Sequence, residues 1–227
     1  MNSFREKIDK KIFNSRNRSL TLSQKSIFDF YKRKLSIKSF LKIKNINNYK
    51  EKILEIGFGT GKTILESAKS NPEFLYVGIE YYKKGIAQLL IDIKKNDLKN
   101  IRLFYGNAED FVKISDKGLF DKILIMFPDP WPKKKHWKRR FIQKNNIREL
   151  SHTLKNKGKV YFFTDDQDLA IWGLRIFLEE KSLIWTAKKP SDCKINTFGY
   201  PESRYEKKAK KEKKNPYYFK FRKVEMN

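Results

Sequence analysis

The sequence predicts an α/β domain with a mostly parallel central sheet and helices on both faces. From Lys52 onward, short apolar runs alternate with longer amphipathic ones, as strands joined by crossover helices require. A glycine-rich turn follows the first apolar run, as it does at the ligand-binding edge of open parallel sheets. The chain has 227 residues, the length of one such domain, so we expect a single domain over residues 1–227.

The alternation assigns the elements of this sheet in order. Strands are predicted at Lys52–Ile56, Phe74–Glu80, Ile101–Tyr105, Asp121–Phe127 and Lys159–Thr164. Helices are predicted between them at Thr63–Ser70, Lys84–Asn96, Arg139–Leu154 and Asp168–Glu180. Two further strands are predicted at Ser182–Thr186 and Tyr217–Arg222, the second of them antiparallel at or near an edge.

Two segments flank this core. A basic N-terminal arm covers about residues 1–48, and a helix is predicted within it at Ser23–Leu41. A C-terminal segment of about residues 190–227 is expected to contact the substrate. Its lysine-rich part, Lys207–Lys214, fits a mobile loop and a solvated helical face equally well.

The charge balance predicts an anionic partner. Lys and Arg number 52 against 26 Asp and Glu, and the net charge of +26 repels itself unless a partner such as nucleic acid compensates it. A general drift towards lysine explains part of this excess. It does not explain why basic residues concentrate at Arg16–Arg18, Lys133–Arg140 and Lys207–Lys214.

The remaining composition argues against several classes of protein. Cys193 is the only cysteine, which leaves no disulfide framework or thiolate metal cluster and favours a reducing, cytoplasmic setting. His136 and His152 are the only histidines, and no metal site is expected. We also expect no membrane span, since no apolar run reaches the ~18 residues that one needs.

A glycine loop follows the first strand as EIGFGTGKT, residues 55–63. Glycines let a ligand lie against bare backbone. A Walker A loop would need glycine where Ile56 stands, and a dinucleotide fingerprint would place its third glycine three residues after the second. The spacing of Gly57, Gly59 and Gly61 behind Glu55 instead fits S-adenosylmethionine, whose ammonium Glu55 can pair with.

Polar residues end the next two strands. Glu80 lies about 20 residues beyond the loop, the position from which a carboxylate reaches a ribose diol. Asn107 follows the third strand, and its amide can both donate to and accept from an adenine edge. An ordinary turn explains Asn107 nearly as well.

The fourth strand delivers a stiff loop, PDPWP, at residues 128–132. Prolines on both sides of Asp129 and after Trp131 restrict the backbone and fix the two side chains at the ligand-binding edge. A rigid turn with Trp131 in the core is the structural alternative.

A basic run with aromatic residues comes directly after this loop. Cations hold phosphates, and aromatic faces stack on unpaired bases. Positive charge is unfavourable at a helix N-terminus, a cost that an anionic substrate would offset. We therefore expect RNA contacts from Lys135, His136, Trp137, Lys138, Arg139 and Arg140.

Together these features resemble the bacterial tRNA (guanine-N7-)-methyltransferases of the TrmB family. The resemblance rests on the loop behind Glu55, on Glu80, on FPDPWPKKKHWKRR at residues 127–140 and on Thr164-Asp165, and it includes Arg16-x-Arg18-x-x-Thr21-x-x-Gln24. It implies a Rossmann-like class I fold that uses S-adenosylmethionine. It also implies a tRNA partner, methylated at N7 of the guanine at position 46 in the variable loop to give 7-methylguanosine.

The resemblance also implies roles for individual residues. The expected cofactor contacts are Glu55, Gly57, Gly59, Gly61, Glu80, Asn107 and Asp129. The expected substrate contacts are Lys133, Asp165, Ser203 and Glu206. The family usually has Asp in place of Asn107 and Thr in place of Ser203, and Thr197 with Glu202 offers another register for this last motif.

The chemistry asks mainly for alignment, because guanine N7 carries a free lone pair and no proton to remove. Asp129 is the expected catalytic residue, holding the guanine or the positive charge that grows on its ring. Asp165 and Glu206 are expected to help fix the base.

Three other functions fit parts of the sequence. They are methylation of an exocyclic amine, a non-catalytic RNA-binding module and an NAD-dependent dehydrogenase. The segment FPDPWP orders its prolines differently from the D/N-P-P-aromatic turns of enzymes that methylate exocyclic amines. The second half-fold of an NAD-dependent dehydrogenase is missing from this sequence. The sequence fits a monomer or a homodimer.

Overall fold

The computed structural model describes residues 19–32, 35, 46–196 and 199–225. The predicted basic cluster Arg16–Arg18 lies outside these residues, as does much of the predicted helix Ser23–Leu41. The described part of that helix is α2, Leu22–Tyr31, which begins with a capping box between Thr21 and Gln24.

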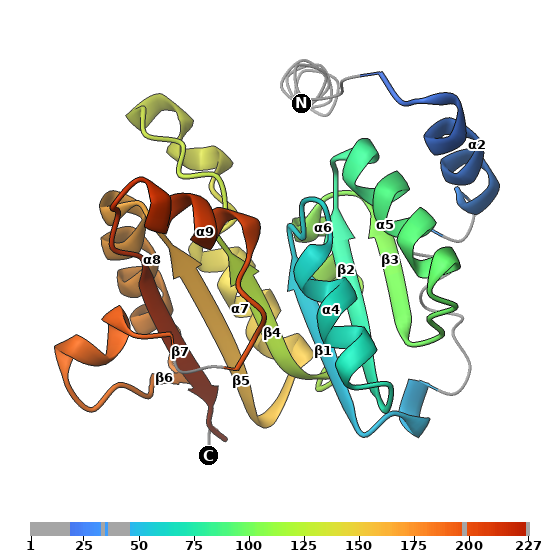
Figure 1. Ribbon diagram of the computed structural model, residues 1–227. Coiled ribbons are helices and arrows are strands. Elements are labelled where there is room, and N and C mark those ends of the chain that lie inside the picture. Colours follow the sequence, from blue (N-terminus) through green and yellow to red (C-terminus); the bar gives the residue numbers. More distant parts are fainter. Residues whose placement is uncertain (1–18, 33–34, 36–45, 197–198, 226–227) are drawn as a thin grey trace, which may run out of the picture.

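The core is a seven-stranded sheet in the order β3-β2-β1-β4-β5-β7-β6 (Figure 1). Its strands are β1 Glu51–Ile56, β2 Phe74–Glu80, β3 Ile101–Tyr105, β4 Phe120–Met126, β5 Leu154–Thr164, β6 Leu183–Trp185 and β7 Tyr217–Lys223. The first five are parallel, and β7 runs antiparallel between β5 and β6. The chain turns back between β1 and β4, and such a switch point opens a crevice at the carboxyl ends of the strands.

Helices cover both faces of the sheet, as the sequence predicts (Figure 1). One face carries α2, α4 (Lys62–Ser70) and α5 (Lys83–Lys95), and the other carries α6 (Ala108–Ile114), α7 (Lys144–Thr153) and α8 (Gln167–Glu179). Successive strand residues serve opposite layers because their side chains alternate. Ile53 packs into the first layer and Leu54, fully buried, into the second.

The predicted helix Arg139–Leu154 is wrong at its start. The basic run forms a separate 3-10 helix, η2 (Lys134–Arg139), the chain is extended at Arg140, and α7 begins only at Lys144. The basic run therefore does not form the N-terminus of α7, whose first residue is Lys144, and the electrostatic cost expected for the run does not arise there. Two more short 3-10 helices are η1 (Ile46–Asn48) and η3 (Pro190–Lys194).

The lysine-rich C-terminal stretch is largely helical, which resolves the two alternatives for Lys207–Lys214. The helix α9 spans Arg204–Lys211 and starts from Ser203, whose hydroxyl accepts from the backbone N–H of Glu206. Ala209 is fully buried, so this helix has one packed face. In Figure 1, α9 lies beside the carboxyl ends of β4 and β5.

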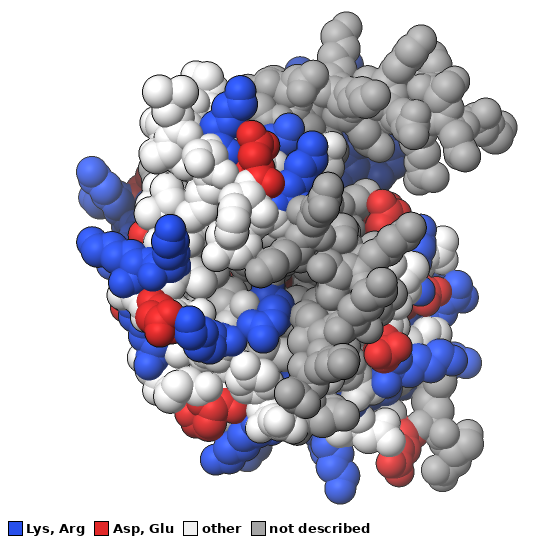
Figure 2. Space-filling model, turned by 90° about the vertical axis from the view of Figure 1, so that its right-hand side faces the viewer, with Lys and Arg blue, Asp and Glu red and all other residues white. Residues whose placement is uncertain are grey.

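Positive charge is scattered over the face of the molecule shown in Figure 2, where Lys and Arg side chains are separated by uncharged residues and by a few Asp and Glu. Charge alone does not locate a binding site, and the geometry of the sheet edge has to do so.

Candidate active site

A cleft of about 560 Å³ opens at the carboxyl ends of β1, β2 and β4. Its lining joins four segments that are distant in sequence: the glycine loop, the end of β2, the start of α6 and the loop after β4. Tyr205 from α9 closes one side. The cleft thus lies at the switch point of the sheet.

The glycine loop forms the floor of this cleft. Gly57 and Gly59 have φ angles of 74° and 60°, which side chains adopt only at a cost. A Cβ atom built on Gly57 would meet nothing within 4 Å, so space for a ligand lies above it. One built on Gly85 of α5 would collide with the Gly59 carbonyl, and this helix therefore packs directly against the loop.

Glu80 holds the loop in place. Its Oε2 accepts from the N–H of Gly59 at 2.7 Å, while Oε1 accepts from the N–H groups of Tyr81 at 2.6 Å and Tyr82 at 2.9 Å. A carboxylate has about four acceptor positions, so one remains, on Oε2. Burial raises the pKa of Glu80 against the effect of these three donors, and Asp129 raises it further.

Glu55 lies behind the loop at the end of β1. Its side chain is 4% exposed, and burial together with the charge of Glu80 raises its pKa to about 8. A nearby cation would favour the ionised form of both carboxyl groups. Glu55 is not among the residues that line the cleft, and its contact with the cofactor's ammonium group stays a prediction.

Asn107 caps α6 at the adjoining edge of the cleft. Its Oδ1 accepts from the N–H of Glu109 at 3.0 Å, which orients the side-chain amide. The amide oxygen of Asn107 therefore has a local structural role, as a helix cap. The NH₂ half remains available to a ligand, and Asn107 lines the cleft.

The loop after β4 carries Asp129 between two strained residues. Phe127 has a φ angle of 51° and Trp131 one of 45°, a region that aromatic residues rarely adopt. Such strain costs about 1–3 kcal/mol per residue and tends to mark functional sites. Asp129 is exposed, lines the cleft and faces Glu80 closely enough to affect its pKa.

Trp131 stays at the surface of the cleft and is not a core residue. The guanidinium carbon of Arg139 lies 5.0 Å from its ring centre, and His136 meets it edge to face at 5.8 Å. Desolvation, with Arg139 and nearby lysines, lowers the pKa of His136. Lys138 and Arg139 line the cleft, whereas Lys133 and Lys135 are exposed beside it.

Two members of the predicted RNA-binding set face the interior. Arg140 is 1% exposed, so its prediction as a surface RNA contact is wrong. It lies against the rings of Trp137 and Trp172, at 4.8 and 5.3 Å from their centres. Trp137 is half-buried and uses one face for this packing. The attraction between a guanidinium and indole faces explains why these residues turn inward.

The C-terminal motif is placed differently from its expected role. Ser203 and Glu206 are both buried, and neither is among the residues lining the cleft. Glu206 accepts from the hydroxyl of Tyr218 at 2.8 Å and from Asn196 at 3.1 Å. These contacts anchor α9 and direct Tyr205, which sequence reasoning missed, towards the glycine loop. The signal available in the sequence was an aromatic residue inside the predicted substrate motif, Ser203-Arg-Tyr205-Glu206.

Asp165 lies outside the cleft lining at the end of β5. Its carboxylate is 3.4 Å from the ammonium of Lys214, just beyond α9. The alternative register, with Thr197 and Glu202, stays a prediction because Thr197 lies outside the described residues. Glu202 forms an ion pair with Lys210.

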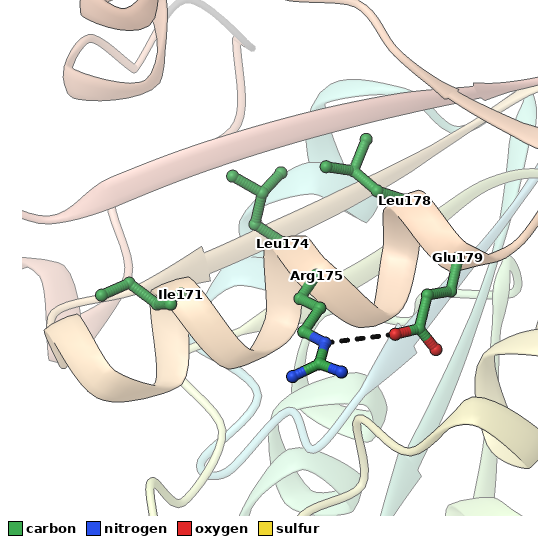
Figure 3. Close-up of a pocket in the computed structure, with 5 residues that line it drawn as sticks. All are labelled: Ile171, Leu174, Arg175, Leu178 and Glu179. Carbon is green, nitrogen blue, oxygen red and sulfur yellow. Dashed lines mark hydrogen bonds and ion pairs between the residues drawn. The ribbon is translucent and has the colours of Figure 1, made fainter.

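A second hollow lies on α8, away from the strand ends that form the cleft. Figure 3 shows that Ile171, Leu174 and Leu178 line it on one helix, with Arg175 donating to Glu179 at 3.2 Å. It contains no group suited to methyl transfer. Within the described ranges, no helix is long and apolar enough to cross a membrane, and no three His, Cys, Asp or Glu residues gather as metal ligands would.

The fold is that of the class I, Rossmann-like methyltransferases. Solved structures share the fold: a 16S rRNA methyltransferase, KamB, superposes with a TM-score of 0.61 at 13% identity over 84% of this chain and 95% of its own. An aminoglycoside resistance methyltransferase gives 0.55 at 17% identity over 84% and 94%. These likenesses concern the fold alone.

The sequence comparisons define the family. Residues 49–219 match the family described as "Putative methyltransferase". The tRNA (guanine-N(7)-)-methyltransferase of Agrobacterium fabrum is 37% identical over 74% of this chain and 72% of its own length. Those of Rhodopseudomonas palustris and Zymomonas mobilis are each 35% identical over 75% of this chain, and over 68% and 74% of their own lengths. The chain belongs to this methyltransferase family, as the resemblance of its motifs predicted.

Proposed function

We propose that the protein transfers a methyl group from S-adenosylmethionine to N7 of a guanine in tRNA, in the variable loop at position 46. The observation that carries this proposal is the cleft itself. It brings the glycine loop and Glu80 to face Asp129 in its strained loop, with cations at the rim. The names of the relatives support tRNA and guanine N7 as substrate and target.

The residues of the cleft fit the cofactor. The free acceptor position on Glu80 Oε2 suits a ribose hydroxyl, and the space above Gly57 suits a ligand lying on the backbone. Glu55, buried below, would gain its negative charge on meeting the ammonium group. The amide NH₂ of Asn107 would donate to a ring nitrogen of the adenine. When bound, S-adenosylmethionine supplies an electrophilic methyl group.

Asp129 is the residue that we assign to the target base. Guanine presents N1–H and N2–H donors, which a carboxylate accepts, and its ring becomes positive as N7 is methylated. Asp129 is exposed in the cleft and held by a loop of low freedom, so it can meet that charge without moving. No side chain has to remove a proton from N7.

The buried C-terminal residues act on the substrate through α9. Ser203 and Glu206 fix the helix, and Tyr205 presents its ring beside the glycine loop, 3.7 Å from where a Gly59 Cβ would lie. Aromatic rings stack on extruded bases. We assign Tyr205 to one face of the guanine, and Asp165 to the base or ribose once RNA displaces Lys214.

The rim of the cleft would hold the RNA backbone. Lys133, Lys135, Lys138 and Arg139 are contributed by one short segment beside Trp131. Such a cluster binds phosphates in a salt-dependent way.

With a single cysteine and a tRNA substrate, we place the protein in the cytoplasm, and its assembly as a monomer or homodimer can be measured by sedimentation.

The decisive experiment supplies methyl-labelled cofactor and unmodified tRNA, followed by digestion to nucleosides. We expect the label in 7-methylguanosine, and we expect it to disappear when G46 of the tRNA is replaced by A. Label in an N-methylated exocyclic amine would overturn the assigned target. Cofactor binding without transfer to any RNA would favour a non-catalytic RNA-binding module.

A further inference from the structure

Arg140 is a large cation in the interior beside the candidate active site. Its Nε–H donates to the carbonyl oxygen of Pro130 at 2.8 Å, one residue beyond Asp129. Its guanidinium contacts the indoles of Trp137 and Trp172, whose centres lie 5.3 Å apart with the rings tilted by 56°. The cation therefore fills the angle between two tryptophans and also holds the loop that carries Asp129.

Each indole donates its N–H to a backbone carbonyl beside the cation. Trp137 donates to the carbonyl of Pro132 at 3.4 Å, and Trp172 donates to the carbonyl of Ile142 at 2.8 Å. Trp172 belongs to α8, which follows the end of β5. The cluster thus connects the β4 loop with the element that comes after Asp165.

This arrangement is a costly way to fill space. Within the described part of the chain, Nη2 of Arg140 is buried without a hydrogen-bond partner. Burial lowers the pKa of Arg140, and Asp166 and Asp168 act against that effect. Apolar residues of similar volume commonly stabilise a fold as well as or better than buried charge does. Stability alone therefore does not require an arginine here.

We propose that Arg140 is a positioning residue for methyl transfer, which holds the Pro130 carbonyl and through it the Asp129 carboxylate at a fixed place relative to α8. This inference rests on the proposed role of Asp129. A guanidinium is planar, stacks on aromatic rings and holds its Nε–H in a fixed direction. The ammonium group of a lysine has neither the planar face nor the fixed Nε–H donor. A misplacement of about 1 Å in a site of this kind costs roughly 10²-fold in rate.

The test compares two Arg→Lys substitutions in the full-length protein. Arg140→Lys keeps the charge and loses the geometry. The matched control, Arg175→Lys, alters an exposed arginine on α8 that pairs only with Glu179 among the described residues. Fold is measured by circular dichroism and thermal unfolding, cofactor binding by calorimetry with S-adenosylhomocysteine, tRNA affinity over a series of salt concentrations, and transfer by single-turnover rates.

We expect Arg140→Lys to lower the single-turnover rate at saturating ligands by about 10-fold to 100-fold. Cofactor and tRNA affinities should stay within about threefold, and the salt dependence of tRNA binding should not change, because Arg140 faces no phosphate. Arg175→Lys should match the wild type throughout. A merely structural role would lower the unfolding temperature and leave the rate per folded molecule unchanged.

A second variant covers the case in which Arg140→Lys does not fold. Trp172→Phe removes the indole N–H and part of one ring face but leaves Arg140 in place. It should lower the rate at least threefold with unchanged binding. Where both variants fold, their effects on rate should be less than additive, since they disturb one unit.

Three results would overturn the inference. They are a folded Arg140→Lys with the wild-type rate, a salt dependence lowered by about one unit, which would mean a phosphate contact, and an unchanged rate in Trp172→Phe when Arg140→Lys cannot be purified. Wild-type methylation at another atom would overturn the proposed target and leave the Arg140 comparison valid. A wild-type protein that transfers no methyl group would overturn both.

Discussion

The two walls of the cleft differ in how far their polar side chains are exposed to solvent. On the wall formed by β1, β2 and α6, Glu80 accepts three backbone N–H groups and Asn107 caps a helix, so each side chain is already oriented. On the wall formed by the β4 loop and α9, Asp129 and Tyr205 are exposed. On this second wall, Asp129 is positioned by the strained backbone of the β4 loop, and Tyr205 is positioned by the buried residues that anchor α9.

This difference matches the two kinds of ligand that the walls would meet. A small cofactor of constant shape is best bound by preformed groups, because little entropy is then lost on binding. A tRNA has to bring in one base from a large molecule, and an exposed carboxylate and ring at the mouth can receive it. Changes on the β4 side should therefore affect the rate, and changes on the β1 side should affect cofactor binding.

Asp129→Asn should give the largest effect and the sharpest test of this contrast. Replacing the carboxylate removes the charge that faces the methylated ring, and we expect the single-turnover rate to fall by about 10²-fold or more. S-adenosylhomocysteine affinity should change by less than about fivefold. Asp116→Asn, an exposed acid outside the cleft lining, is the control. A larger loss of cofactor binding than of rate would place Asp129 on the cofactor wall.

Tyr205→Leu should weaken the use of tRNA by about tenfold in kcat/KM, since stacking on a base contributes about 1–3 kcal/mol. Tyr205→Phe should stay within about twofold because it keeps the ring. Steady-state rates with tRNA, together with calorimetry for the cofactor, distinguish an effect on the use of tRNA from an effect on cofactor binding. If Leu and Phe behave alike, the ring does not stack on the base.

Glu55 makes cofactor binding depend on pH in a defined direction. Its pKa of about 8 means that it is largely protonated at pH 7 and ionised at pH 9, and only the ionised form attracts the ammonium group. The α-ammonium group of the ligand also titrates near pH 8, so the charged pair is most populated near that pH. Affinity for S-adenosylmethionine should fall roughly tenfold or more from pH 8 to pH 6, where Glu55 becomes protonated while the ammonium group keeps its charge. Glu55→Gln should remove this fall, and calorimetry at pH 8 and pH 6 would show equal wild-type affinities if the assignment is wrong.

Lysines at the rim should give the smallest effects. Lys135→Ala and Lys138→Ala should each weaken tRNA binding a few fold and lower the slope of log affinity against log salt by about one, without changing the rate at saturation. Lys117→Ala, in the loop before β4 at the opposite end of the sheet, should leave both unchanged. A lower rate at saturating tRNA would mean that η2 takes part in the methyl-transfer step and not only in tRNA binding.

Much of this molecule follows from local sequence. The bounds of β2 and β3 were predicted to the residue, because apolar β-rich runs end there in Glu80 and in a glycine turn. The glycine loop was assigned correctly to the end of β1, since its spacing allows few other conformations. The short helix α6 was missed: at seven residues it is too brief to show a clear helical period.

The loop at 127–140 shows where local reasoning ends. The sequence alone determined a stiff turn that presents Asp129 at a strand end, because proline restricts the backbone wherever it stands. Only the tertiary structure decided which basic residues face solvent. Arg140 turned inward because Trp172, 32 residues later, supplies a ring for its guanidinium, and Glu206 turned inward because Tyr218 on β7 supplies a hydroxyl. Such contacts depend on which elements the fold brings together, and no period or spacing records them.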